Sequence, residues 1–229
     1  MAEQPAAFST SEAFRFGWEK TKTNLKPLLI IGAIGAFLAV LHQSLVGSGR
    51  ETGLRMLMGL LVQIVQACVG LAYVRSALRL YDAKSIDLSK PAEVFFEDFF
   101  PYLLTSILYS LVVAAGLVLL IVPGVIWGLM FMFATYLVVD KKLDPISAFV
   151  ESKRLTKGIK GQLLGFALLA IGINLLGALA LGVGLLFTIP ITVIAGAYVL
   201  RRLQERAGAR APESHEPPIL TPRPPVEQP

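Results

Sequence analysis

The chain has 229 residues, of which 55% are hydrophobic and only 16% are charged, and its mean hydropathy is +0.66. Because soluble domains carry a charge on about a quarter of their residues, this composition argues against a soluble domain and indicates a chain solvated largely by lipid. The net charge of +5 would suit nucleic-acid binding, but the basic residues form no single dense patch, which argues against that class of partner.

Residues 1–10 are predicted to be a mobile N-terminus. Ser11 is the predicted N-cap of a short amphipathic helix over residues 12–24, in which Phe14 and Trp18 fall along one side and basic residues lie elsewhere. Aromatic rings beside basic residues, directly before an apolar run, are typical of a helix at the membrane interface.

The apolar run over residues 99–139 is about twice as long as a helix that crosses a ~30 Å hydrocarbon core, so it must fold back on itself. We place the turn at Pro123 and Gly124, where a missing N–H and a permissive φ make it least costly. The run over residues 163–200 is also too long, and we place its turn at residues 182–184. The six predicted spans are residues 28–46, 54–80, 99–122, 124–139, 163–181 and 185–200.

Asp144 followed by Pro145 is a start signal for a helix between the fourth and fifth spans. Its small and apolar residues recur at 4-3-4 spacing along one side, namely Ala148, Ser152, Leu155 and Ile159. The opposite side carries the candidate contacts to anionic lipid headgroups, which are Lys153, Arg154, Lys157 and Lys160. In the alternative interpretation, these basic residues only set the orientation of the chain.

An amphipathic or aromatic-rich stretch precedes a pair of spans three times, near Glu12, Pro91 and Pro145. This order predicts three repeats, each made of an interfacial stretch and a transmembrane hairpin. The first and third copies align without a gap, and the identical pairs include Ala13 with Ala148, Phe14 with Phe149, Thr21 with Thr156, Lys22 with Lys157 and Leu28 with Leu163.

Charge predicts the orientation of this all-α bundle of six transmembrane helices, which we assign to residues 11–203. With six spans, 19 of the 21 lysines and arginines fall on one face of the membrane, and only Arg50 and Arg55 fall on the other. The positive-inside rule places the richer face, with both termini, in the cytoplasm. Residues 204–229 are rich in proline and are predicted to be a disordered cytoplasmic tail.

Apart from three arginines toward the ends of the second span, the predicted spans carry no charged residue, which argues against an ion-coupled pump. Their amides, Gln63, Gln66 and Asn174, are either a candidate midplane polar site or hydrogen-bonding contacts between helices. The sequence contains no phosphate-binding glycine loop, zinc-binding His-Glu motif or nucleophile elbow, and Cys68 is its single cysteine. We therefore expect no catalytic residue, no metal, no cofactor and no enzymatic activity.

A set of motifs between Pro123 and Phe166 resembles a known family; it comprises Pro123-Gly124-Val-Ile-Trp, Phe133-Ala-Thr-Tyr136-Leu-Val-Val-Asp140, Ala148-Phe149, Ser152 and Lys157-Gly158. These residues are similar to the membrane domain fused to some glycerophosphoryl diester phosphodiesterases and to related small bacterial inner-membrane proteins. The resemblance implies a six-span helical fold with interfacial helices in the bacterial inner (plasma) membrane. It implies no phosphodiesterase activity, because the residues after Leu200 are too few and too rich in proline to form the catalytic barrel.

Two functions are compatible with these observations. The first is a non-catalytic integral membrane protein whose partner is the lipid bilayer, and which acts as a lipid-interacting scaffold or modulator through the basic helix after Pro145. The alternative is a transporter or channel for a small or lipid-like solute, which requires Gln63, Gln66 and Asn174 to converge on one cavity.

Overall fold

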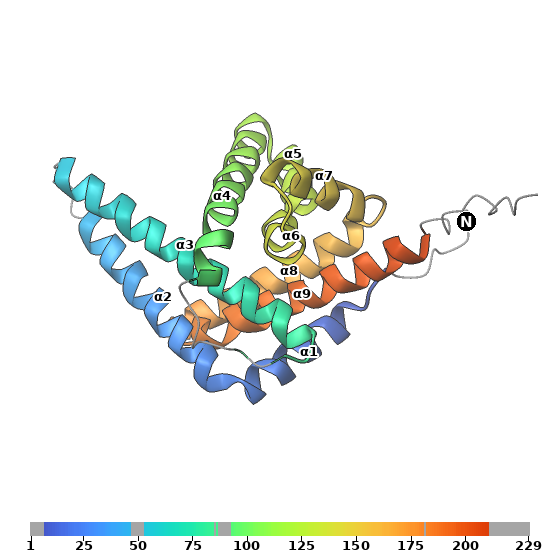
Figure 1. Ribbon diagram of the computed structural model, residues 1–229, viewed down its shortest axis with the longest axis horizontal. Helices are drawn as coiled ribbons and strands as arrows, with labels where there is room; N and C mark the ends of the chain where they lie inside the picture. The colour runs from blue at the N-terminus through green and yellow to red at the C-terminus, as the bar shows by residue number, and fades with distance from the viewer. Residues whose placement is uncertain (1–6, 47–52, 85, 87–92, 181, 211–229) are drawn as a thin grey trace, which may run out of the picture.

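The computed structural model describes residues 7–46, 53–84, 86, 93–180 and 182–210, and within these ranges its secondary structure consists of nine α-helices without a strand (Figure 1). The helices are α1 (Thr10–Thr23), α2 (Leu25–Val46), α3 (Gly53–Tyr81), α4 (Glu93–Leu119), α5 (Ile121–Phe131), α6 (Ala134–Lys141), α7 (Pro145–Leu155), α8 (Lys160–Leu179) and α9 (Leu185–Arg210). The prediction of an all-α bundle is confirmed.

Six segments of the described chain are long and apolar enough to cross a membrane, so the protein is a multi-pass membrane protein. They are Leu25–Leu45, Gly53–Tyr81, Glu97–Leu119, Ile121–Lys141, Lys160–Leu179 and Leu185–Ala209. Large apolar side chains such as Phe37, Val40 and Leu111 are exposed on their surfaces. A soluble protein would bury most of this apolar surface, whereas a bilayer solvates it.

The turn in the central hairpin lies at Leu120, so its predicted position at Pro123 and Gly124 was wrong. Pro123 instead occupies the first turn of α5, where its missing N–H costs no helical hydrogen bond. Gly124 allows α4 and α5 to pack closely, because a Cβ atom there would lie 2.6 Å from the side chain of Leu117. The predicted turn at residues 182–184 is confirmed, with Gly182 at a φ of +75°.

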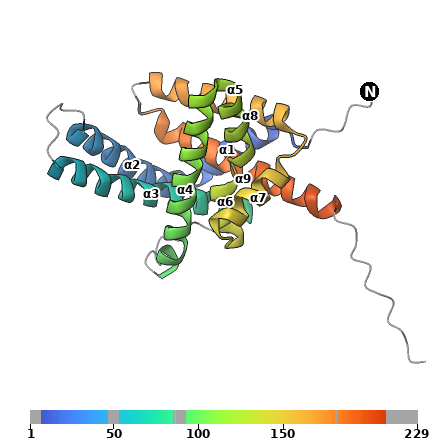
Figure 2. The same cartoon turned by 90° about the horizontal axis from the view of Figure 1, so that it is seen from above.

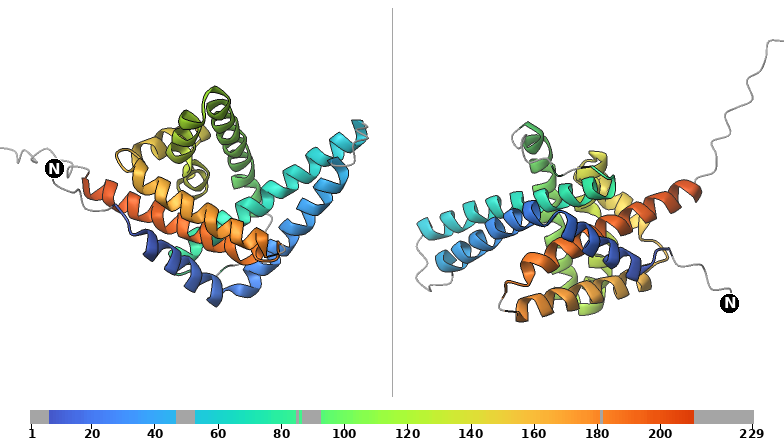
Figure 3. Two further views of the ribbon diagram at one scale, coloured as in Figure 1. Left: turned by 180° about the vertical axis from the view of Figure 1, so that it is seen from behind. Right: turned by 90° about the horizontal axis from the view of Figure 1, so that it is seen from below.

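Helix α1 packs along α9 (Figure 3). Its N-cap is Ser9, whose hydroxyl accepts a hydrogen bond from the N–H of Glu12, and not the predicted Ser11. Of the predicted apolar side, Phe14 is buried but Trp18 is 49% exposed. The close approach is possible because of Gly17, where a Cβ atom would lie only 2.5 Å from the carbonyl oxygen of Ile191.

The leading segment of each predicted repeat docks on the second span of another repeat. Helix α1 packs on α9, α7 packs on α6, and the first turns of α4 pair with α3 through Asp98 and Arg75. The alignment of the first and third copies agrees with burial, because both members of three aligned pairs are buried, namely Ala13 and Ala148, Thr21 and Thr156, and Leu28 and Leu163. In the second copy, the aromatic stretch is continuous with α4.

The C-terminal boundary of the bundle also differs from the prediction. Helix α9 continues to Arg210, so residues 204–210 are helical and not part of a disordered tail. This extension is held by side chains such as Gln204, which donates a hydrogen bond to Asp140. Residues 211–229 and 1–6, and most of the predicted turn between the first two spans, lie outside the described residues.

Candidate functional site: a charged junction beneath the spans

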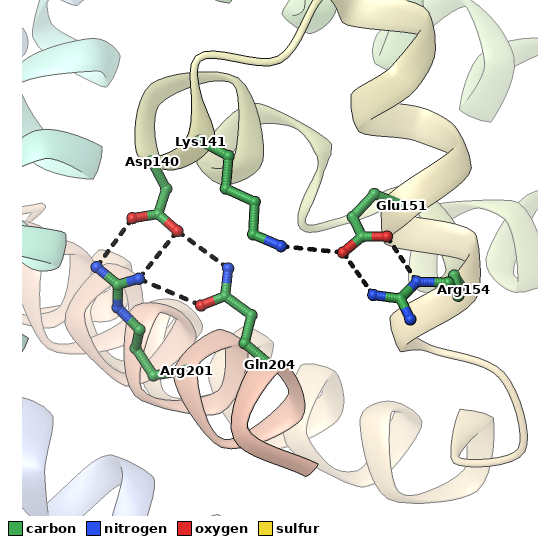
Figure 4. A network of polar contacts seen from close by, with 6 residues as sticks. All are labelled: Asp140, Lys141, Glu151, Arg154, Arg201 and Gln204. Carbon is green, nitrogen blue, oxygen red and sulfur yellow. Dashed lines mark hydrogen bonds and ion pairs between the residues drawn. The ribbon is translucent and has the colours of Figure 1, made fainter. Parts of the chain in front are cut away.

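Three consecutive residues at the end of the fourth span bind three different elements. Asp140 pairs with Arg201 of α9, Lys141 donates a hydrogen bond of 3.1 Å to Glu151 of α7 (Figure 4), and Lys142 pairs with Asp98 of α4. Side chains of successive helical residues point about 100° apart, and Lys142 adopts a left-handed φ of 54° that turns the chain further. The end of α6 is therefore the centre of a charged junction.

Arg201 joins the ends of three spans. Its guanidinium group binds both carboxylate oxygens of Asp140, at 2.9 and 2.8 Å, and lies 3.0 Å from Asp82, which directly follows α3. Bidentate pairing of this kind is stronger and more directional than a single ion contact. The side chains of Arg201 and Asp140 are only 21% and 10% exposed, so solvent screens this pair weakly.

Asp98 is the most deeply buried acid of the junction, with 2% of its surface exposed. Its carboxylate lies 2.5 Å from the guanidinium group of Arg75 in α3 and also pairs with Lys142. One turn further along α4, the hydroxyl of Tyr102 packs so closely on Gly70 that a Cβ atom there would lie 2.5 Å away. The N-terminal end of the third span is therefore fixed to the second span.

Helix α7 begins and packs as predicted. The carboxylate of Asp144 accepts a hydrogen bond from the N–H of Ser147, which caps the helix and lowers the pKa of Asp144. The predicted stripe is buried at all four of its positions, which are Ala148, Ser152, Leu155 and Ile159. The small residues on this stripe bring α7 close to the end of the fourth span.

A break in the fourth span explains the one polar residue of that stripe, Ser152, and the buried Thr156 that caps the end of α7. Helix α5 ends at Phe131 and α6 begins at Ala134. The carbonyl oxygen of Met130 accepts hydrogen bonds from the hydroxyls of Ser152 at 2.9 Å and Thr156 at 3.2 Å. Because a buried carbonyl without a partner is costly, these hydroxyls stabilise the break and fix α7 against it.

The four candidate lipid contacts, Lys153, Arg154, Lys157 and Lys160, are all exposed. Arg154 differs from the others because both oxygens of Glu151 bind its guanidinium group, at 2.6 and 2.8 Å. Two large apolar side chains lie on the same outward side of α7, Ile146 at 73% and Val150 at 64% exposure. Residues 146, 150 and 153 follow each other at helical spacing, so the outward stripe of α7 begins with two apolar residues and ends with Lys153, and Lys157 lies exposed in the turn that follows the helix.

We expect the Glu151 ion pairs to stabilise the folded protein at neutral pH and to lose this effect at strongly acid pH. The hydrogen bonds from Arg154 and Lys141 lower the pKa of Glu151 from its ordinary 4.5 to about 2. Its contribution is therefore complete above pH 4.5 and is lost as the pH falls toward 2. Since both partners are substantially exposed, thermal unfolding in detergent should show a loss of only about 1 kcal/mol for Glu151→Gln at pH 7. If Glu151→Gln cost as much stability at pH 2 as at pH 7, the assignment of a lowered pKa to Glu151 would be contradicted.

The three candidate midplane amides are not brought together. Gln63 is exposed on α3, and Gln66 lies at the interface of α2 and α3 close to Gly35. Asn174 donates a hydrogen bond of 3.3 Å to Thr192 at the interface of α8 and α9. Gln66 and Asn174 thus occupy contacts between different pairs of helices, and their side-chain carbonyl oxygens are buried without a hydrogen-bond partner among the described residues.

In comparisons with known proteins, no protein-family model, curated protein or solved structure matches this chain. Within the residues that the structure describes, no group of three or more His, Cys, Asp and Glu side chains could hold a metal ion. The functional assignment therefore depends on the junction and on the outward stripe of α7.

Proposed function

We propose that the protein is a non-catalytic membrane protein that holds anionic lipid headgroups against α7 and acts as a scaffold or modulator of the bilayer. The observation that supports this proposal is the outward stripe of α7, on which Ile146 and Val150 precede Lys153, with Lys157 exposed in the turn directly after the helix. An apolar pair that reaches acyl chains, beside ammonium groups that reach phosphates, is the arrangement of an interfacial helix.

The anchoring of α7 strengthens this site. Ser152 and Thr156 bind the broken fourth span from the inner side of the helix, while Lys141 holds Glu151. The stripe is therefore presented on a rigid support, and headgroup binding orders few further side chains. Each lysine near an anionic surface contributes about 1 kcal/mol, so Lys153, Lys157 and Lys160 together contribute a preference of up to about 100-fold.

The proposed location is the bacterial inner membrane, with α7 and both termini on the cytoplasmic side. Two sequence features support it, namely the bias of basic residues to one face and the resemblance of residues 123–166 to membrane domains of bacterial proteins. The cytoplasmic leaflet is also the anionic one, which suits the charge of the stripe. The transporter alternative loses its support, because Gln66 and Asn174 lie in separate helix contacts.

Reversing the charge of three lysines in and just after α7 tests the proposal. Lys153→Glu, Lys157→Glu and Lys160→Glu together should lower the preference of the purified protein for phosphatidylglycerol over phosphatidylcholine by about tenfold to 100-fold. The preference is measured as the ratio of the two lipids retained from mixed micelles. Arg79→Glu with Lys84→Glu is the control, because these exposed residues also lie on the proposed basic face but at or just after the end of α3, away from α7 and the turn that follows it. An unchanged ratio in the triple variant, or an equal loss in the control, would refute the proposal.

A further inference from the structure

The outer half of the α2–α3 hairpin projects away from the other helices (Figures 1 and 2). The last buried residue of α2 is Gly35, and the continuous buried part of α3 begins at Leu71. Among the residues whose burial the structure describes in the hairpin beyond these two points, only Gly59, which has no side chain, is buried. This half of the hairpin therefore presents its surface to the membrane.

Gln63 lies within that surface and is exposed. It follows Arg55 by eight residues and precedes Arg75 by twelve, about 12 and 18 Å along the helix axis, which places it near the middle of the apolar part of α3. Its amide makes no hydrogen bond to any residue that the structure describes. Lipid tails offer an amide neither a donor nor an acceptor, so this group needs a polar partner at the same depth.

We propose that the edge of α3 formed by Leu60, Gln63 and Ala67 is a contact surface between two copies of this chain. The three residues are spaced by three and four, which is the spacing of a seam between two parallel helices. Leu60 is 63% exposed and supplies apolar contact, whereas Ala67 is partly buried against the core of its own chain and contributes only a small side chain at the inner end of this edge.

Two properties of Gln63, its depth in the membrane and its capacity both to donate and to accept hydrogen bonds, favour a second copy of the chain over another partner at this surface. Two copies inserted in the same direction place Gln63 at the same depth about a twofold axis. An amide group is both donor and acceptor, so the two Gln63 side chains satisfy each other. An unrelated membrane protein would need a polar group at this depth by coincidence.

Disulfide trapping tests the surface in the full-length protein, with Cys68→Ala as the background because Cys68 is the single cysteine. Under mild oxidation in membranes, Leu60→Cys should give a disulfide-linked dimer. Met58→Cys is the matched control, since it is 45% exposed on the same helix but points about 160° away. No dimer from Leu60→Cys, or equal dimer from Met58→Cys, would overturn the proposal.

A second measurement examines the amide itself. Gln63→Leu should raise the dissociation constant of the dimer, measured by energy transfer between labelled copies in neutral-lipid vesicles, by about 3- to 30-fold, whereas Gln63→Asn should restore part of the loss. An unchanged dissociation constant for Gln63→Leu would overturn the role of the amide. Because neutral lipid is used, this result does not depend on the lipid binding proposed for α7.

Discussion

Replacing Arg201 with methionine should destabilise the folded protein by about 2–4 kcal/mol in a denaturation titration in detergent. The substitution keeps an unbranched apolar stem but removes the guanidinium group that binds Asp140 and Asp82. Asp140 is only 10% exposed, so its carboxylate would remain charged in a poorly solvated place. The loss should arise from the ends of α3, α6 and α9 separating, because Arg201 is shared by all three.

The neighbouring residue is the matched control for this prediction. Arg202 is 46% exposed and pairs with the exposed Glu205, so Arg202→Met should cost less than about 1 kcal/mol. Adding Asp140→Asn to Arg201→Met should restore part of the lost stability, since removing both partners leaves no uncompensated charge. Equal losses for the two arginine variants, or strictly additive losses for the pair, would contradict a shared network.

The spans and the buried side of α7 could be predicted because both depend on local patterns. Length and hydropathy define an apolar helix, and 4-3-4 spacing places Ala148, Ser152 and Leu155 on one side regardless of what they pack against. The turn of the central hairpin was misplaced because a proline signals both a turn and the first turn of a helix, and at Pro123 the second meaning applies.

The break in the fourth span had no signal of its own, because residues 131–134 contain neither proline nor glycine. Its signal lay elsewhere, in Ser152 and Thr156 of a different helix, whose hydroxyls bind the freed carbonyl of Met130. From the sequence, the 4-3-4 spacing places Ser152 on the small and apolar side of this helix but indicates no partner for its hydroxyl, and it does not include Thr156. A hydroxyl on the buried side of an amphipathic helix is therefore a reason to search for a broken helix nearby.

The junction could not be predicted, because its pairs join residues far apart in the chain. Asp140 and Arg201 are 61 residues apart, and Lys142 and Asp98 are 44 apart. In the sequence these basic residues were counted only as markers of orientation. The outward apolar residues Ile146 and Val150 were not predicted, because the 4-3-4 spacing describes only the buried side of α7.

The largest effect is expected at Asp98, where Asp98→Asn should cost about 3–5 kcal/mol in the same denaturation titration. The carboxylate is 2% exposed and is shared by Arg75, which is 23% exposed, and Lys142, which is 54% exposed, so neutralising it leaves the largely buried guanidinium group of Arg75 and the ammonium group of Lys142 facing an uncharged amide. The neighbouring Glu97 is exposed, and Glu97→Gln should change stability by less than about 0.5 kcal/mol.

The same site distinguishes an ion-pair role from simple packing. If the charge of Asp98 matters because it balances cations, adding Lys142→Gln to Asp98→Asn should restore stability, because it removes one of the two unbalanced charges. If only the shape of the side chain matters, Asp98→Asn should leave the free energy of unfolding almost unchanged, and Lys142→Gln should lower it by the same amount with or without Asp98→Asn. Lys142 lies at the end of the fourth span, Arg75 lies in the second span, and Asp98 lies at the start of the third. Restored stability in the double variant would therefore also show that Asp98 links the second and fourth spans.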